Sequence, residues 1–169
     1  MSNQSAGRTT GRPAYVEPTA AVLATIDRLA MRSKAAPNEV GPQTTLWKAL
    51  TALPQWVCIN RGAPQAPRPY MLAGESGPIL CIFTSAARAK QAAHESGLVP
   101  AGEQIVLFAP PLPQAVDWAL SYAKYGVVGL AVDYSRLGSW CPPLLTSHTC
   151  EMAGQAPQKC NLLGPYPPR

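Results

Sequence analysis

Hydrophobic residues recur at regular spacing through the middle of the chain, from Pro18 to Asp133. The first period is helical and begins at Pro18, with apolar residues three and four positions apart at Val22, Leu23, Ile26, Leu29 and Ala30. Asp27, Arg28 and Arg32 fall on the other face of this expected helix. The pattern therefore predicts an amphipathic first helix, which either packs on the core or docks on a partner.

A linker and a second helix are expected next. Residues 35–42 contain two prolines and Gly41, which predict an interruption of regular structure. The second helix is expected to start at Thr44 or Thr45, whose hydroxyls can cap it, and to end at Pro54.

The remaining pattern predicts strands and two further helices. Strands are expected at residues 56–60, 70–73, 78–83, 104–108 and 127–132, and helices at residues 86–96 and 112–124. Thr84-Ser85 is expected to cap the alanine-rich helix at 86–96. The continuous apolar run at 79–83 is typical of a central strand that is buried on both faces. The predicted fold class is α+β, with a mixed or antiparallel sheet of about five strands packed by three or four helices in a single domain.

The predicted organisation is one folded domain between two irregular ends. The four segments are a disordered arm at 1–17, a helix and linker at 18–42, an α+β domain at 43–134, and an irregular Pro-rich tail at 135–169.

The basic charge of the chain is concentrated near its beginning. The formal net charge is +5, and residues 1–34 carry five basic and two acidic residues, whereas residues 35–150 carry seven basic and six acidic residues. A nucleic-acid-binding domain is expected to carry a basic stripe with interleaved aromatic residues on its folded face, and the sequence shows none. Nucleic acid is therefore not the expected partner, and a regulator that binds nucleic acid through the basic arm is kept as an alternative.

The expected compartment is the cytoplasm. The first ten residues are polar and contain no apolar segment of the kind found in signal peptides, and no apolar stretch approaches the length that spans a bilayer, so no membrane insertion is expected. The cysteine count, five, is odd. Cys58 and Cys81 lie within apolar runs and are predicted to be buried, reduced thiols.

Short motifs between residues 44 and 134 resemble the N-terminal domain of the SseB (enhanced serine sensitivity) family, which points to a bacterial origin. The motifs are Leu46-Trp47-Lys48-Ala49-Leu50, Trp56-Val57-Cys58-Ile59, Ile82-Phe83-Thr84-Ser85 and Gly126-Val127-Val128-Gly129-Leu130. The chain departs from the family at residues 131–134, where the family usually has an Asn-Pro turn. The resemblance implies an α+β interaction domain, and it supplies no catalytic residues.

No assembled catalytic set is visible in the sequence, and no cofactor is expected. His94 lies on the polar side of its helix without a fitting partner, which favours a solvated surface residue. Asp117 and Asp133 could form a carboxylate pair, but Asp117 is better explained by its place near the start of a helix.

One group of soft ligands lies in the predicted tail: Cys141, His148, Cys150 and Cys160. Four such ligands can bind zinc tetrahedrally, but their spacing lacks the C-x2-C knuckle of common structural zinc sites. A small thiol- or zinc-dependent enzyme using this cluster is therefore the second alternative, and free tail thiols are favoured over it.

The aromatic residues carry the leading functional hypothesis. Trp118 falls off the apolar stripe of its predicted helix, and Trp140 lies outside any core pattern. Exposed aromatic residues are frequent at the energetic centres of protein interfaces. We therefore predict a non-enzymatic interaction module, an SseB-like accessory, adaptor or inhibitor protein, that binds a protein partner through Trp118, Tyr122, Tyr125 and Trp140. Neither the partner's identity nor the oligomeric state follows from the sequence.

Overall fold

The computed structural model describes residues 14–100, 102–137 and 139–141 of the 169-residue chain. Its helices are α1 (Ala20–Ala35), α2 (Val40–Thr51), α3 (Ala86–Glu95), α4 (Gln114–Ser121) and the short 3-10 helix η1 (Tyr122–Tyr125). Its strands are β1 (Cys58–Ile59), β2 (Met71–Gly74), β3 (Gly77–Ile82), β4 (Leu107–Phe108), β5 (Gly129–Val132) and β6 (Ser139–Cys141). The predicted α+β class is confirmed.

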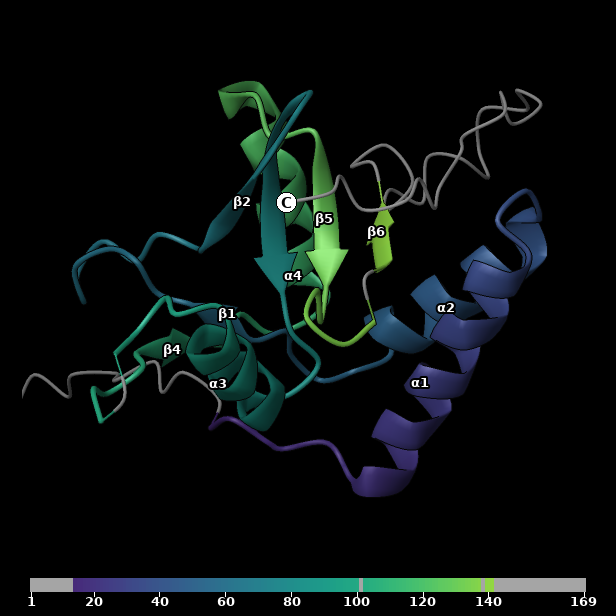
Figure 1. Cartoon of the computed structure of the whole chain (residues 1–169), viewed down its shortest axis with the longest axis horizontal. Helices are drawn as coiled ribbons and strands as arrows, with labels where there is room; N and C mark the ends of the chain where they lie inside the picture. Colours follow the sequence, from purple (N-terminus) through teal and green to yellow (C-terminus); the bar gives the residue numbers. More distant parts are fainter. Residues whose placement is uncertain (1–13, 101, 138, 142–169) are drawn as a thin grey trace, which may run out of the picture.

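The strands form two small sheets. Four of them make a mixed sheet in the order β2-β3-β5-β6, in which β3 and β5 run parallel and both outer strands run antiparallel to their neighbours. The other two, β1 and β4, form an antiparallel pair. A single bridge between Val57 and Phe83 places β1 beside the end of β3. Figure 1 shows α4 behind the larger sheet and α3 beside β1 and β4.

Alternate residues of β3 and β5 point into two separate parts of the core. Leu80, Ile82, Leu130 and Val132 pack with α1, α2 and α4, whereas Cys81 and Ala131 pack with the three buried alanines of α3. This alternation follows from the two-residue period of a strand. The prediction that residues 79–83 form a strand buried on both faces is confirmed from Leu80 to Ile82, while Ile79 is partly buried and Phe83, just after β3, is buried.

The first helix belongs to the fold. It lies side by side with α2 (Figure 1), and Ile26 and Ala30 are each only 1% exposed. The predicted linker at 35–42 is too long, because α2 starts at Val40. Gly41 and Pro42 lie in its first turn, where proline's missing N–H group would have no helical partner in any case. The predicted cap at Thr44 or Thr45 is therefore wrong: the Thr45 hydroxyl instead donates to the Gly41 carbonyl at 2.9 Å.

Both ends of the described chain depart from the predicted boundaries. Residues 14–17, which the sequence assigns to a disordered arm, contact the domain, since the Gln55 side chain donates to the Ala14 carbonyl at 3.2 Å. Residues 139–141, assigned to an irregular tail, form the edge strand β6. The predicted helix at 112–124 is divided into α4 and η1, and Gly126 ends η1 with a left-handed φ of 83°. Among the described residues, no helix is long and apolar enough to cross a membrane.

Candidate functional site

A buried polar cluster lies at the carboxyl ends of the parallel strands β3 and β5. Asp133 directly follows β5 and is 1% exposed. Its carboxylate accepts hydrogen bonds from the Thr84 N–H group at 3.0 Å and from the Thr84 hydroxyl at 2.7 Å. Asp133 has a positive φ of 42°, a conformation that aspartate adopts more readily than most residues. The turn thus aims a carboxylate into the protein.

Arg88 neutralises this carboxylate. It lies in the first turn of α3, where the Ser85 side chain caps the helix by accepting from the Arg88 N–H group. The Arg88 guanidinium forms an ion pair with Asp133 at 2.9 Å and a second one with Asp27 at 2.8 Å. Burial by itself lowers the pKa of Arg88, but its hydrogen bond to Asp133 and the charges of both aspartates outweigh burial, so the net shift is upward. Arg88 therefore stays charged.

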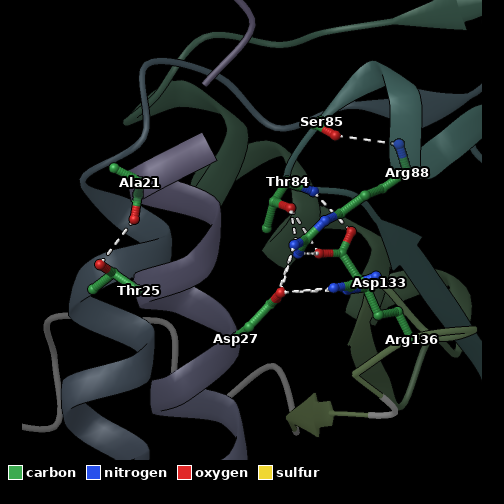
Figure 2. A network of polar contacts seen from close by, with 8 residues as sticks. All are labelled: Ala21, Thr25, Asp27, Thr84, Ser85, Arg88, Asp133 and Arg136. Carbon is green, nitrogen blue, oxygen red and sulfur yellow. Dashed lines mark hydrogen bonds and ion pairs between the residues drawn. The ribbon is translucent and has the colours of Figure 1, made fainter. Parts of the chain in front are cut away.

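Asp27 connects this cluster to α1. Figure 2 shows its carboxylate between Arg88 of α3 and Arg136, which follows β5. The side chain of Asp27 is 22% exposed, and that of Arg136 is 56% exposed. The sequence pattern places Asp27 with Arg28 and Arg32 on the face opposite the core, and for Asp27 this is wrong, because its ion partners come from distant parts of the chain.

The ion pairs of this cluster are suited to holding secondary-structure elements together. Each charged group has an opposite partner within hydrogen-bonding distance, and no group of the cluster is a free nucleophile or base. Asp133 is held by Thr84 and Arg88, whereas Asp117 is exposed on α4, so the carboxylate pair considered from the sequence does not form. The cluster fastens α1 and α3 to the end of the sheet.

The segment before α1 satisfies the start of α3. The Ala86 N–H group donates to the Tyr15 hydroxyl at 2.9 Å and to the Glu17 carboxylate at 3.3 Å, and Tyr15 also donates to Glu17. Burial and then the hydrogen bond to Glu17 raise the pKa of Tyr15 to about 12. A carboxylate at a helix N-terminus is favourable because the first N–H groups are unpaired and carry partial positive charge. The Glu17 carboxylate of the same chain therefore occupies the N-terminus of α3.

A second feature is a series of aromatic rings from β4, α4 and η1, which we call the aromatic ladder: Phe108, Trp118, Tyr122 and Tyr125. Successive ring centroids are 5.7, 5.1 and 6.0 Å apart, with interplanar angles of 89°, 77° and 63°. These are edge-to-face contacts, which aromatic rings prefer over a face-to-face stack.

The last ring of the ladder is the exposed one. Phe108, Trp118 and Tyr122 are half-buried against the core, and Tyr125 is 69% exposed. The expectation that Trp118 lies off the core is therefore wrong, because its ring packs edge-on against Phe108 of β4. Tyr125 is the exposed member of the series.

One cation contacts the outermost ring, and a second one acts electrostatically on Tyr122. The Lys124 ammonium is 5.0 Å from the centre of the Tyr125 ring, within the range of a cation–π contact. Burial, followed by the charges of Cys58 and Tyr125, raises the pKa of Tyr122, and the positive charge of Arg68 opposes that rise. Aromatic rings accompanied by arginine are the composition found at interface hot spots.

The structure brings together three of the four residues predicted to bind a partner. Trp118, Tyr122 and Tyr125 belong to one ladder, while the backbone of Trp140 pairs with Ala131 in β6 and its side chain lies outside the described part of the chain.

The sequence indicates only one part of the polar cluster. The position of Thr84 and Ser85 before an alanine-rich segment predicts a helix cap, and Ser85 does cap α3. The ion pairs that surround this cap carry no local signal in the sequence.

The other candidates for chemistry are placed as follows. His94 is exposed, as predicted. Cys58 and Cys81 are free and buried, also as predicted, and burial raises the pKa of both thiols, that of Cys81 to about 12. The described residues contain no group of three potential metal ligands. Of the proposed zinc ligands, Cys141 is described only through its backbone in β6, and the other three, His148, Cys150 and Cys160, lie outside the described residues.

Comparison with family models, curated proteins and solved structures finds no match to this chain. The resemblance to the SseB family therefore stays a prediction from the short motifs, as do the alternatives of a zinc enzyme and a nucleic-acid-binding regulator.

Proposed function

We propose that this chain is a non-enzymatic protein-binding module, an SseB-like accessory, adaptor or inhibitor protein, that contacts its partner through the aromatic ladder around Tyr125. The sequence-based expectation of a bacterial, cytoplasmic protein is part of this proposal. The observation that carries it is the exposure of a tyrosine ring at the end of a series of packed aromatic rings.

Tyr125 has the properties of an interface anchor. Its ring is 69% exposed, yet the edge-on contact with Tyr122 and the Lys124 ammonium restrict its orientation. A side chain that is already ordered loses little conformational entropy on binding, and burial of a tyrosine ring contributes strongly to affinity. Tyr122 contacts the Tyr125 ring and packs in turn against Trp118, and both of these rings are half-buried against the core.

The polar cluster supports this choice of site. Its charges compensate one another and its carboxylates are bound to arginines, so it offers a substrate no free acid or base. The ladder, by contrast, presents apolar ring surface that a partner can bury.

Tyr125 also has a matched control within the chain. Met31 on α1 is 70% exposed, and Figure 1 shows α1 well away from the start of β5, which η1 precedes in the chain. We expect a photocrosslinking benzoylphenylalanine at position 125 to capture a protein from extracts of the source organism, and the same group at position 31 to capture none.

The captured protein then allows an affinity measurement. Tyr125→Ala is expected to weaken its binding by at least about tenfold, as loss of a hot-spot residue does, whereas Met31→Ala leaves the affinity unchanged. Equal crosslinking from both positions, or an unchanged affinity of Tyr125→Ala, would contradict the proposal.

A further inference from the structure

The last described strand, β6, ends at the same end of the larger sheet as the turn that follows Tyr125. In β6, Cys141 pairs with Leu130, the second residue of β5, and the two strands are antiparallel. Cys141, the last residue of β6, therefore lies near the beginning of β5. At this end of the sheet η1, which carries Tyr125, leads through Gly126 into β5. Figure 1 shows β6 pointing toward the end at which β5 begins.

The chain that follows β6 is long enough to reach the ladder. Residues 142–169 comprise 28 residues, and an extended chain covers at most about 3.3–3.6 Å per residue. Tyr125 is only five positions before Leu130 in the sequence. The extended length of residues 142–169 is therefore several times the length of the five-residue stretch between Tyr125 and Leu130.

The end of the chain has the composition of segments that bind to aromatic surfaces. Residues 161–168 read Asn-Leu-Leu-Gly-Pro-Tyr-Pro-Pro. Such a sequence favours the polyproline II helix, which has three residues per turn, so that Leu162, Pro165 and Pro168 share one ridge. Segments of this P-x-x-P type dock on surfaces lined with aromatic rings, and their preformed helix reduces the entropy lost on binding.

The ladder has dimensions that suit this ridge. One turn of polyproline II is about 9 Å long. The steps from Trp118 to Tyr122 and from Tyr122 to Tyr125 are 5.1 and 6.0 Å, so the three rings together offer contacts over a comparable length.

From these observations we propose that the aromatic ladder binds the segment Asn161–Pro168 of the same chain, so that a partner must displace this segment to bind. The inference rests on the proposed function, because it identifies the class of segment that the ladder recognises. A connected segment has an effective concentration in the millimolar range, so weak intrinsic binding is enough to keep the ladder occupied.

A paramagnetic label tests the contact directly in the full-length chain. With Cys141 and Cys150 replaced by serine, a nitroxide reacts with Cys160 alone, because Cys58 and Cys81 are buried. We expect the amide NMR signals of Lys124, Tyr125 and Gly126 to lose intensity, and those of α3 to keep it. The loss should disappear in Pro165→Ala/Pro168→Ala and in Tyr125→Ala.

A competition measurement gives a second readout. A synthetic peptide of residues 161–168 is expected to bind the full-length Pro165→Ala/Pro168→Ala variant about tenfold more tightly than the wild type, where the attached segment competes.

Several results would overturn the inference. These are undiminished signals at residues 124–126, signal loss spread evenly over the protein, signal loss that persists in Tyr125→Ala, or equal peptide affinity of the two chains. None of them alters the crosslinking and affinity results expected for Tyr125 and Met31, so failure of this inference is distinguishable from failure of the proposed function.

Discussion

Replacing Arg88 by methionine tests whether the polar cluster braces the fold. The substitution keeps an unbranched side chain with good helix propensity in α3 and removes the cation that is paired with Asp133. The side chains of Arg88 and Asp133 are 11% and 1% exposed, so the carboxylate left behind has almost no access to water. Removing one partner of a buried ion pair costs about 3–5 kcal/mol.

The expected loss lies at the lower end of that range. Asp133 keeps its two hydrogen bonds from Thr84, and Asp27, at 22% exposure, can be hydrated. We therefore expect Arg88→Met to lower the free energy of unfolding by about 3 kcal/mol, a large part of the roughly 5–15 kcal/mol typical of a domain. With a urea m-value of about 2 kcal/mol/M, the midpoint falls by about 1.5 M.

Arg136→Met is the matched control. It makes the same chemical change and removes another ion partner of Asp27, at 3.1 Å, but its side chain is 56% exposed. An exposed ion pair contributes about 0–1 kcal/mol, so the urea midpoint should move by less than about 0.5 M.

A double substitution isolates the charge of Asp133. Asparagine has nearly the same shape and tolerates a positive φ, so Asp133→Asn removes the charge without backbone strain. Arg88→Met should cost less in this background, and the coupling between the two positions should be at least about 1 kcal/mol. Equal midpoints for Arg88→Met and Arg136→Met, or additive effects of Arg88→Met and Asp133→Asn, would refute the reasoning.

Two further stability predictions follow from buried thiols and from the start of α3. Burial raises the pKa of Cys81 to about 12 from an ordinary value of 9.0, so between these pH values the folded state retains a proton that the unfolded state releases. The free energy of unfolding should therefore fall as pH rises through this window, by up to about 1.4 kcal/mol per pH unit for this thiol, and urea titrations should show a shallower slope in Cys81→Ala; an identical slope would contradict the assignment. Glu17→Gln should lower stability by about 0.3–1 kcal/mol and Ser85→Ala by about 0.5–2 kcal/mol in the same assay, because α3 loses an anion and a cap respectively; a Glu17→Gln variant as stable as the wild type would show that the segment before α1 does not stabilise α3.

The elements predicted correctly are those that local pattern specifies. The run from Leu80 to Phe83 is long and apolar, and Ser85 caps α3 as expected from its position before an alanine-rich segment. Gly41 and Pro42 misled the prediction because they stop a helix interior but are tolerated in a first turn. The strand β6 was missed because its three residues carry no recognisable period and are ordered by pairing with β5.

The polar cluster could not be predicted from the sequence, because its partners are distant in the chain. Asp27 is separated from Arg88 by 61 residues and from Arg136 by 109, and Arg88 from Asp133 by 45. On a single helix, Asp27 has the pattern of a solvated residue, and only tertiary packing brings cations to it. The aromatic ladder was partly predictable, since Trp118, Tyr122 and Tyr125 follow the spacing of one helix, whereas Phe108 joins them from strand β4.

The topology separates the two features. Because β3 and β5 are parallel, their carboxyl ends lie together, and that end carries Thr84 and Asp133. The opposite end of β5 is reached from η1, and it carries Tyr125. Ligands of open parallel sheets usually bind at the carboxyl ends of the strands. Here the chain's own ion pair between Asp27 and Arg88 lies at that end, which favours the opposite end, with Tyr125, as the proposed partner surface.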